Sequence, residues 1–321
     1  MKIYVRNREG LGQRGVDCYS WSYCNDNDHQ SSFDCYGDLT AYDNGILLVP
    51  FPEVGGRHVS IIKTITPKDE TSKITTEPFI NYFDRLCYWN YNTDNVGRTV
   101  TQIITDNWIN QADSVYKADW IDLDITESGE FPMPELDDNM MFNVKEFLLS
   151  LQRTGRLYLS ALPTTTGVKL TDHAEQSEVS NIFIGVGYNK LISETYSNQI
   201  TAKVTNNVDD AETNYYLHSD GSFDTTDVDR VYGKWEKVFA KTEEEIADIF
   251  NANKYEHKIA FYSNIPKRAG SLITIRTEDG RIIKSVVTCV KIESKDNRIR
   301  YECGRLKTTL TDILGGINNG K

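Results

Sequence analysis

Residues 271–303 read SLITIRTEDGRIIKSVVTCVKIESKDNRIRYEC and contain three short apolar runs separated by turn residues. Apolar and polar side chains alternate along these runs, which is typical of a β-strand with one buried face. Asp279-Gly280 separates the first two runs and is a strong hairpin signal. The stretch therefore predicts three strands, at Ser271–Thr277, Arg281–Ile292 and Ile299–Cys303. Together with a fourth strand that precedes them, Ile259–Tyr262, they are expected to form a β-meander.

Strand signals also dominate the rest of the chain. The first 65 residues predict a small antiparallel β-unit with strands near 16–24, 31–37, 45–49 and 58–65. Further strands are expected over Arg156–Leu162, Ser180–Val186 and Tyr215–Leu217. There is no βαβ rhythm, which excludes a parallel nucleotide-binding sheet. We therefore expect a β-rich α+β fold, made of small antiparallel β-barrel domains with α+β inserts.

Four helices are predicted between the strands. The first begins near Thr76 and places four apolar residues on one face: Ile80, Phe83, Leu86 and Cys87. The second follows Gly97, and the third runs from about residue 143 to Gly155. The fourth begins at Thr242, which forms a capping box with Glu245.

The length of 321 residues corresponds to about two domains at roughly 150 residues each. The pattern of elements divides the chain more finely. We expect an N-terminal β-barrel-like domain over 1–70, an α+β insert over 71–160 and a second β-rich domain over 161–240. Residues 241–321 are then a C-terminal helix and β-meander that contribute to the second barrel.

The net charge limits the classes of partner. Lys and Arg number 35 against 47 Asp and Glu, which gives a net charge of −12. An acidic surface repels phosphate backbones and anionic lipids, so binding to nucleic acid or to a membrane surface is disfavoured. No apolar run approaches the roughly 20 residues that span a bilayer, and the N-terminus lacks the apolar stretch of a secretory signal.

Eight of the acidic residues lie within 119–138, a segment without Lys, Arg or His. Ile121 and Leu123 alternate with Asp122 and Asp124, which predicts an edge strand with an acidic outer face. Asp122 and Asp124 would lie about 7 Å apart, a separation at which inverting glycosidases hold their two carboxylates. A solvated edge or a partner-facing patch is the simpler interpretation. An ion site or the lining of a DNA channel is a further alternative for this segment.

Aromatic residues gather in two clusters that could anchor a protein interface or stack on sugars. Tyr19, Trp21 and Tyr23 are expected to share one face of a strand, and Tyr88, Trp89 and Tyr91 form the second cluster. Together with the acidic strand, these clusters suggest an alternative function, a protein that binds carbohydrate or cleaves cell walls. Core packing and contacts between subunits are the preferred interpretations of the two aromatic clusters.

The six cysteines offer one candidate metal site. Cys18, Cys24, His29 and Cys35 are ligand-type residues close in sequence, but their spacing fits no common zinc motif. Free cysteines pack as small hydrophobic residues, so we expect reduced thiols in a protein made in a cytoplasm. No catalytic, cofactor-binding or metal-binding residue is predicted.

Several segments resemble a known family in order and spacing. They are Ile184–Leu191, Arg230–Lys234, the helix 242–251, Gly270–Ile275 and Gly304–Asp312. The chain resembles the baseplate-hub or tail-tip hub proteins of tailed bacteriophages and phage tail-like particles, above all those of phages with Gram-positive hosts. The resemblance spans most of the chain and is strongest over 230–314.

The resemblance implies a structural virion protein of the tail tip or baseplate rather than an enzyme. A homotrimer of such a protein joins the six-fold end of the tail tube to the three-fold central tip. The implied partners are the distal ring proteins of the tail tube, the spike, fibre or tail-tip proteins, and the tape measure protein. The resemblance implies no cofactor, no sequence-specific binding of nucleic acid and no membrane insertion.

Overall fold

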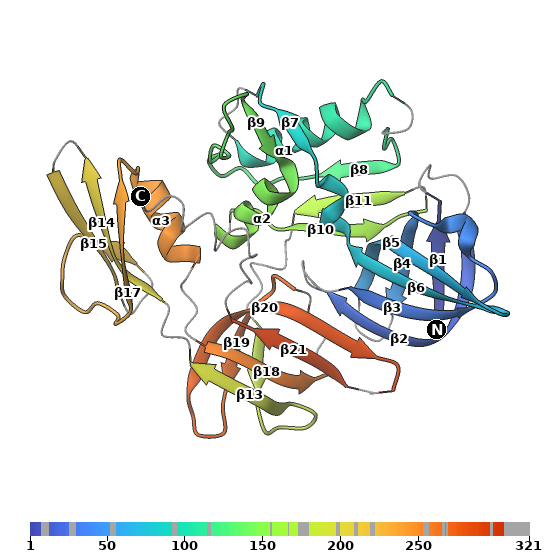
Figure 1. Cartoon of the computed structure of the whole chain (residues 1–321). Coiled ribbons are helices and arrows are strands. Elements are labelled where there is room, and N and C mark those ends of the chain that lie inside the picture. Colours follow the sequence, from blue (N-terminus) through green and yellow to red (C-terminus); the bar gives the residue numbers. More distant parts are fainter. Residues whose placement is uncertain are drawn as a thin grey trace.

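The structure is a computed structural model that describes residues 1–7, 13–25, 30–51, 56–91, 95–113, 117–154, 156–165, 167–172, 180–196, 200–208, 211–218, 222–252, 257–264, 267, 269–295 and 298–304. Its strands form one 12-stranded sheet and three smaller sheets (Figure 1). Within the described residues, no helix is both long and apolar enough to cross a membrane. The predicted β-rich α+β class is confirmed.

The first β unit is a closed antiparallel barrel of six strands, drawn in blue to cyan in Figure 1. Its order is β1-β4-β5-β6-β3-β2, and β2 closes the barrel by pairing with β1. Phe33, Leu47 and Ile62 are among the side chains that fill the interior. The strands expected over the first 65 residues are all present. The barrel also contains two strands that were not predicted, β1 and β6. The bounds of the six strands are β1 Lys2–Arg6, β2 Gln13–Asn25, β3 Ser31–Tyr36, β4 Ile46–Phe51, β5 Gly56–Lys68 and β6 Thr71–Pro78, with a 3-10 turn η1 at Thr40–Tyr42.

The predicted helix from residue 76 is wrong. Thr76 lies in β6, where it pairs with Ser31 on one side and with Ile62 on the other. Pairing on both sides satisfies the backbone of this β-branched segment and overrides the local helix signal. Only a 3-10 turn follows, η3 at Phe79–Phe83, and the chain then enters the short strand β7 at Leu86–Tyr88.

An α+β unit packs against the outside of the barrel. Two predicted helices are confirmed, and the first of them continues into a π-helical turn. The core of the unit extends onto outward-facing barrel residues, Ile46, Leu48 and Val59, so barrel and insert share one apolar contact. Its elements are α1 Val96–Ile104, the π turn η4 Thr105–Ile109, β8 Ile121–Asp124, β9 Met141–Asn143, α2 Val144–Thr154, β10 Leu159–Pro163 and β11 Val168–Asp172.

The second β unit is a six-stranded sheet with the order β12-β19-β20-β21-β18-β13. Asp279-Gly280 turns the chain from β19 into β20, as predicted, and Gly280 has the positive φ of +85° that favours glycine. The four C-terminal strands do not form a simple meander, because β18 pairs with β21 and not with β19. The bounds are β12 Ser180–Phe183, β13 Lys190–Tyr196, β18 His257–Ser263, β19 Leu272–Arg276, β20 Ile282–Glu293 and β21 Ile299–Cys303.

A small unit lies between β13 and β18 in the chain and has its own core. Helix α3 covers one face of a four-stranded sheet, with Ile246 and Phe250 against Val204 and Leu217. The predicted capping box is present: Thr242 N–H donates to Glu245 Oε2 at 2.8 Å, and Glu245 N–H donates to Thr242 Oγ1 at 3.3 Å. The elements are β14 Thr201–Val208, β15 Ala211–Leu217, β16 Phe223–Asp224, β17 Lys234–Phe239 and α3 Glu243–Ala252.

Candidate assembly surfaces

The two β units are joined edge to edge by strands β2 and β20. Residues Ser22–Asn25 pair antiparallel with Val290–Glu293, which merges the barrel and the second sheet into one continuous sheet (Figure 1). The N–H of Ser294 extends the contact by donating to the carbonyl of Trp21 at 2.9 Å. Ile292 packs against the cores of both units. The chain thus presents two six-stranded β units side by side.

Each β unit exposes large apolar side chains on its outer surface. On the barrel, Tyr19 of β2 and Tyr36 of β3 are 48% and 58% exposed, and their ring centroids lie 4.9 Å apart. On the second unit, Phe183 and Ile282 flank Arg276 in register, and the Arg276 guanidinium lies 5.7 Å from the Phe183 ring centroid. Exposed apolar groups of this kind are typical contact points between proteins.

The exposure of Tyr19 corrects the prediction for the first aromatic cluster. Cys18 pairs with Cys35, and Ser20 pairs with Asp34, so Tyr19 is the extra residue of a β-bulge. A bulge changes which side chains face the core. Tyr19 therefore points outward, whereas Trp21 and Tyr23 pack inside the barrel.

The second aromatic cluster is divided between core and surface. Trp89 stacks on Phe131 with ring centroids 5.4 Å apart and packs in the core of the α+β unit with Tyr91. Tyr88 is exposed on β7. Core packing therefore accounts for most of this cluster.

Residues Ile121–Asp124 of the acidic segment form the edge strand β8, as predicted, because within the described residues β8 pairs only with β11, in the sheet order β10-β11-β8. Lys169 of β11 forms an ion pair with Asp124 at 2.6 Å, and this contact raises the pKa of Lys169. Asp122 and Asp124 are both exposed. Exposed carboxylates along the edge of a sheet are typical of a solvated acidic edge, which is the simpler interpretation of this strand.

Two further acids, Asp137 in the segment and Asp172 outside it, hold turns in place. The Asp172 carboxylate accepts hydrogen bonds from the N–H groups of Thr126 and Glu127, each at 2.6 Å. Asp137 accepts from the N–H groups of Asn139 and Met141. Local capping of backbone donors therefore accounts for Asp137 within the segment and for Asp172 outside it.

The candidate metal set is not assembled within the described part of the chain. Cys18 and Cys35 face one another across β2 and β3, but Cys24 lies farther along β2, beside β20. His29 lies outside the described residues. A search of the described residues finds no group of three or more metal-ligating side chains.

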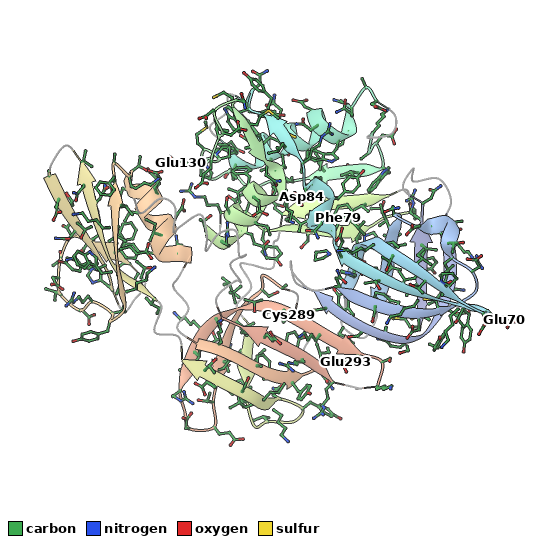
Figure 2. The ribbon with its side chains drawn as sticks, in the orientation of Figure 1. Glu70, Phe79, Asp84, Glu130, Cys289 and Glu293 are labelled. Carbon is green, nitrogen blue, oxygen red and sulfur yellow. The ribbon has the colours of Figure 1, made fainter. Side chains whose placement is uncertain are left out.

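A cleft of about 790 Å³ lies between the α+β unit and the small unit. It is lined by α2, by the loop 130–135 and by the start of α3. Arg156 spans it: Nε donates to Asp248 Oδ1 at 2.9 Å, and Nη1 donates to the carbonyl of Glu130 at 3.1 Å. Figure 2 shows Glu130 on the side of the α+β unit that faces α3. Burial raises the pKa of Asp248, although Arg156 opposes the rise.

The second face of the small sheet is open to solvent and was not predicted from the sequence. Trp235 of β17 is 62% exposed, and its Nε1–H donates to Thr205 Oγ1 at 2.8 Å, which fixes the indole. The Lys203 ammonium lies between two rings, 4.8 Å from the Trp235 centroid and 5.6 Å from the Tyr216 centroid. The aromatic and β-branched residues Trp235, Val238 and Phe239, which favour strands, were the sequence signal for β17.

Comparison with solved structures shows one shared fold. The chain is similar to a tail protein from Neisseria meningitidis, with 11% identity, a TM-score of 0.55 and 95% of each chain covered. It is also similar to the 43 kDa tail protein of prophage MuSo2 from Shewanella oneidensis, with 12% identity, a TM-score of 0.56, and 95% of this chain and 98% of that chain covered. The prophage tail protein gp18 of Listeria monocytogenes matches with 10% identity, a TM-score of 0.54 and 99% of each chain covered.

No family model matches the sequence, and no curated protein matches it. At such low identities the likeness concerns the fold alone. Because the similar structures come from three different bacteria, they do not point to one type of host. The resemblance to phage tail proteins is therefore confirmed for the fold of nearly the whole chain.

Proposed function

We propose that the protein is a structural, non-enzymatic component of a phage-type tail, in which three copies form the hub between the tail tube and the central tip. The observation that carries the proposal is the β2–β20 junction, which holds two six-stranded β units side by side in one chain. Three chains would offer six such units to a six-fold ring of tail subunits. This arrangement resolves the mismatch between three-fold and six-fold symmetry without a second protein.

The exposed apolar groups support the same role. Tyr19 and Tyr36 on the barrel, and Phe183 and Ile282 on the second unit, give each β unit an outward apolar contact point. The proposed partners are the distal ring proteins of the tail tube above and the spike, fibre or tail-tip proteins below, with the tape measure protein as a further partner. The protein would be located at the tail tip or baseplate of the virion, after synthesis in the bacterial cytoplasm. A Gram-positive host is part of the proposal.

The stoichiometry of a complex tests this function. The chain is co-expressed with the tail-tube protein encoded in the same genome, and the purified complex is weighed by native mass spectrometry. The proposal predicts three copies of this chain for every six copies of the tube protein. A 1:1 or 6:6 complex, or a chain that never retains the tube protein, contradicts it.

Carbohydrate binding is a second candidate, and it is favoured by the open face of the small sheet rather than by the acidic strand. A fixed, exposed indole beside a cation can stack on a sugar ring. Titration with solubilised host wall polysaccharide tests the idea. Trp235→Ala should abolish binding, whereas Tyr36→Ala, on the other side of the chain, should leave it unchanged. Absence of binding by the unaltered chain would exclude this candidate.

A further inference from the structure

Two cysteines meet at the junction between the β units. The sulfur atoms of Cys24 on β2 and Cys289 on β20 lie 2.8 Å apart, close enough for one thiol to donate to the other. Cys24 is 7% exposed and Cys289 is 1% exposed. The two residues are 265 positions apart in sequence, and Figure 2 shows Cys289 and Glu293 along β20. The contact is therefore made by the fold and not by local sequence.

The backbone holds Cys24 in place for this contact. Its N–H donates to Ser31 Oγ at 3.0 Å, and the Ser31 hydroxyl donates back to the Cys24 carbonyl at 3.3 Å. Cys24 also pairs in register with Lys291 of β20. These contacts fix the Cys24 side chain against the strand that carries Cys289.

A cationic side chain, Lys291, also lies beside the thiol pair, in register with Cys24. A thiolate is the attacking species in disulfide exchange, and a nearby cation stabilises it. Lys291 supplies that cation, and its Nζ lies 3.5 Å from Glu302. Burial works against the charge of Lys291, but Glu302 and the two cysteines raise its pKa, so the ammonium persists.

We propose that Cys24 and Cys289 form a disulfide when the protein meets a small disulfide oxidant such as oxidised glutathione, and that this bond joins the two β units covalently. The Cys24 thiolate attacks one sulfur of the oxidant, which releases one glutathione and leaves a mixed disulfide. The Cys289 thiolate then attacks the Cys24 sulfur and releases the second glutathione. Two protein thiols lose two electrons and two protons in total, and one oxidised glutathione becomes two reduced glutathiones.

The position of the bond gives it a structural consequence. Within the described residues, strand pairing between the β units is limited to Ser22–Asn25 and Val290–Glu293. A covalent bond at this short contact would keep the units together even when the strands separate. Because both thiols are buried, the first exchange requires local opening of the junction, so oxidation should be slow in the native protein.

Other cysteines could be oxidised instead, so the test has to identify which two cysteines are linked. Cys18 and Cys35 face one another within the barrel, and their interaction lowers the pKa of Cys18 and raises that of Cys35. A bond there would not connect the two β units. Cys87 is buried in the core of the α+β unit and serves as a control position.

Mass mapping after oxidation tests the proposal. The purified full chain is incubated with excess oxidised glutathione, quenched in acid, alkylated under denaturing conditions and weighed before and after proteolysis. We expect the protein to lose two of its six alkylatable thiols and to yield a linked peptide pair that contains Cys24 and Cys289. The midpoint of chemical denaturation should rise on oxidation.

Variants separate the possible outcomes. Cys24→Ser and Cys289→Ser should each prevent the linked peptide and the rise in midpoint, whereas Cys87→Ser should leave both intact. Mapping of the unaltered chain does not depend on the folding of any variant. Retention of all six thiols after prolonged oxidation, even in mild denaturant, would overturn the proposal. A bond that maps to Cys18 and Cys35, with Cys24 and Cys289 still reduced, would also overturn it. A monomeric chain that still forms the bond would contradict the proposed hub but not this inference.

Discussion

Tyr23 and His58 meet inside the first barrel, where the Tyr23 hydroxyl oxygen lies 2.9 Å from His58 Nδ1 and the ring centroids are 4.3 Å apart. The residues come from β2 and β5, which are not neighbours in the sheet, so the contact crosses the barrel interior. His58 Nε2 is buried without a hydrogen-bond partner among the described residues. Burial lowers the pKa of His58 to about 3.

This contact predicts acid sensitivity of the barrel. Since the pKa of His58 is about 3 in the folded protein and about 6.5 in the unfolded chain, the unfolded chain binds the extra proton between these values. The free energy of unfolding should fall by up to about 1.4 kcal/mol for each pH unit below about 6. His58→Gln should remove this part of the slope in urea titrations, whereas Tyr23→Phe should retain it. Equal slopes for His58→Gln and the unaltered protein would contradict the assignment.

The ion pair between Arg156 and Asp248 lies in the cleft between α2 and α3, and its loss should affect stability with the opposite dependence on pH. Arg156→Gln should destabilise the protein by about 1.5 kcal/mol or more at neutral pH, because Asp248 is left half-buried without its cation. Loss of Arg156 should raise the pKa of Asp248 further, so folding would favour the protonated carboxyl. The loss of unfolding free energy in Arg156→Gln, relative to the unaltered protein, should therefore grow as the pH rises past about 4 and shrink at lower pH. A deficit that is constant from pH 4 to pH 7, measured by urea unfolding, would refute this coupling.

The junction between the β units offers a matched pair of substitutions on one strand. Ile292→Ala should cost about 2 kcal/mol, because this half-buried side chain packs against both cores. Ile282→Ala, at an exposed position on the same strand, should change stability by less than about 0.5 kcal/mol. Thermal and urea unfolding measure both. Equal effects of the two variants would show that Ile292 does not hold the units together.

The capping box of α3 predicts a local effect in the small unit. Thr242→Ala removes the side-chain acceptor of the Glu245 N–H and should cost about 1 kcal/mol. Hydrogen exchange of the α3 amides should accelerate, while exchange in the barrel should not change. Uniform acceleration over the whole chain would contradict an independent core for this unit.

Local patterns in the sequence predicted strands β2 to β5 of the barrel but not β1 and β6, together with helices α1, α2 and α3 and the Asp279-Gly280 hairpin. These elements follow from periodicity, capping and turn chemistry, which lie within a few neighbouring residues. The helix expected at residue 76 failed because Thr76 gains partners on both sides, at Ser31 of β3 and at Ile62 of β5. Strand β5 is joined to β6 by a tight turn after Lys68, but β3 is distant in the chain and no residue near Thr76 indicates that pairing.

Features of the candidate surfaces depended even more on distant contacts. The bulge at Tyr19 is defined by its register with β3, and it decides which aromatic residues are exposed. The place of β18 beside β21, and the contact between Cys24 and Cys289, depend on strand order. The predicted domain boundaries at residues 70, 160 and 240 stay predictions, although α3 packs against β14 on the other side of residue 240.

The mass of the protein in solution tests the central claim most directly. Light scattering over a concentration series measures it without any partner. We expect a mass near three times 36.6 kDa, which corresponds to a closed trimer. A mass of 36.6 kDa at every concentration would contradict a hub that forms its three-fold ring from this chain alone.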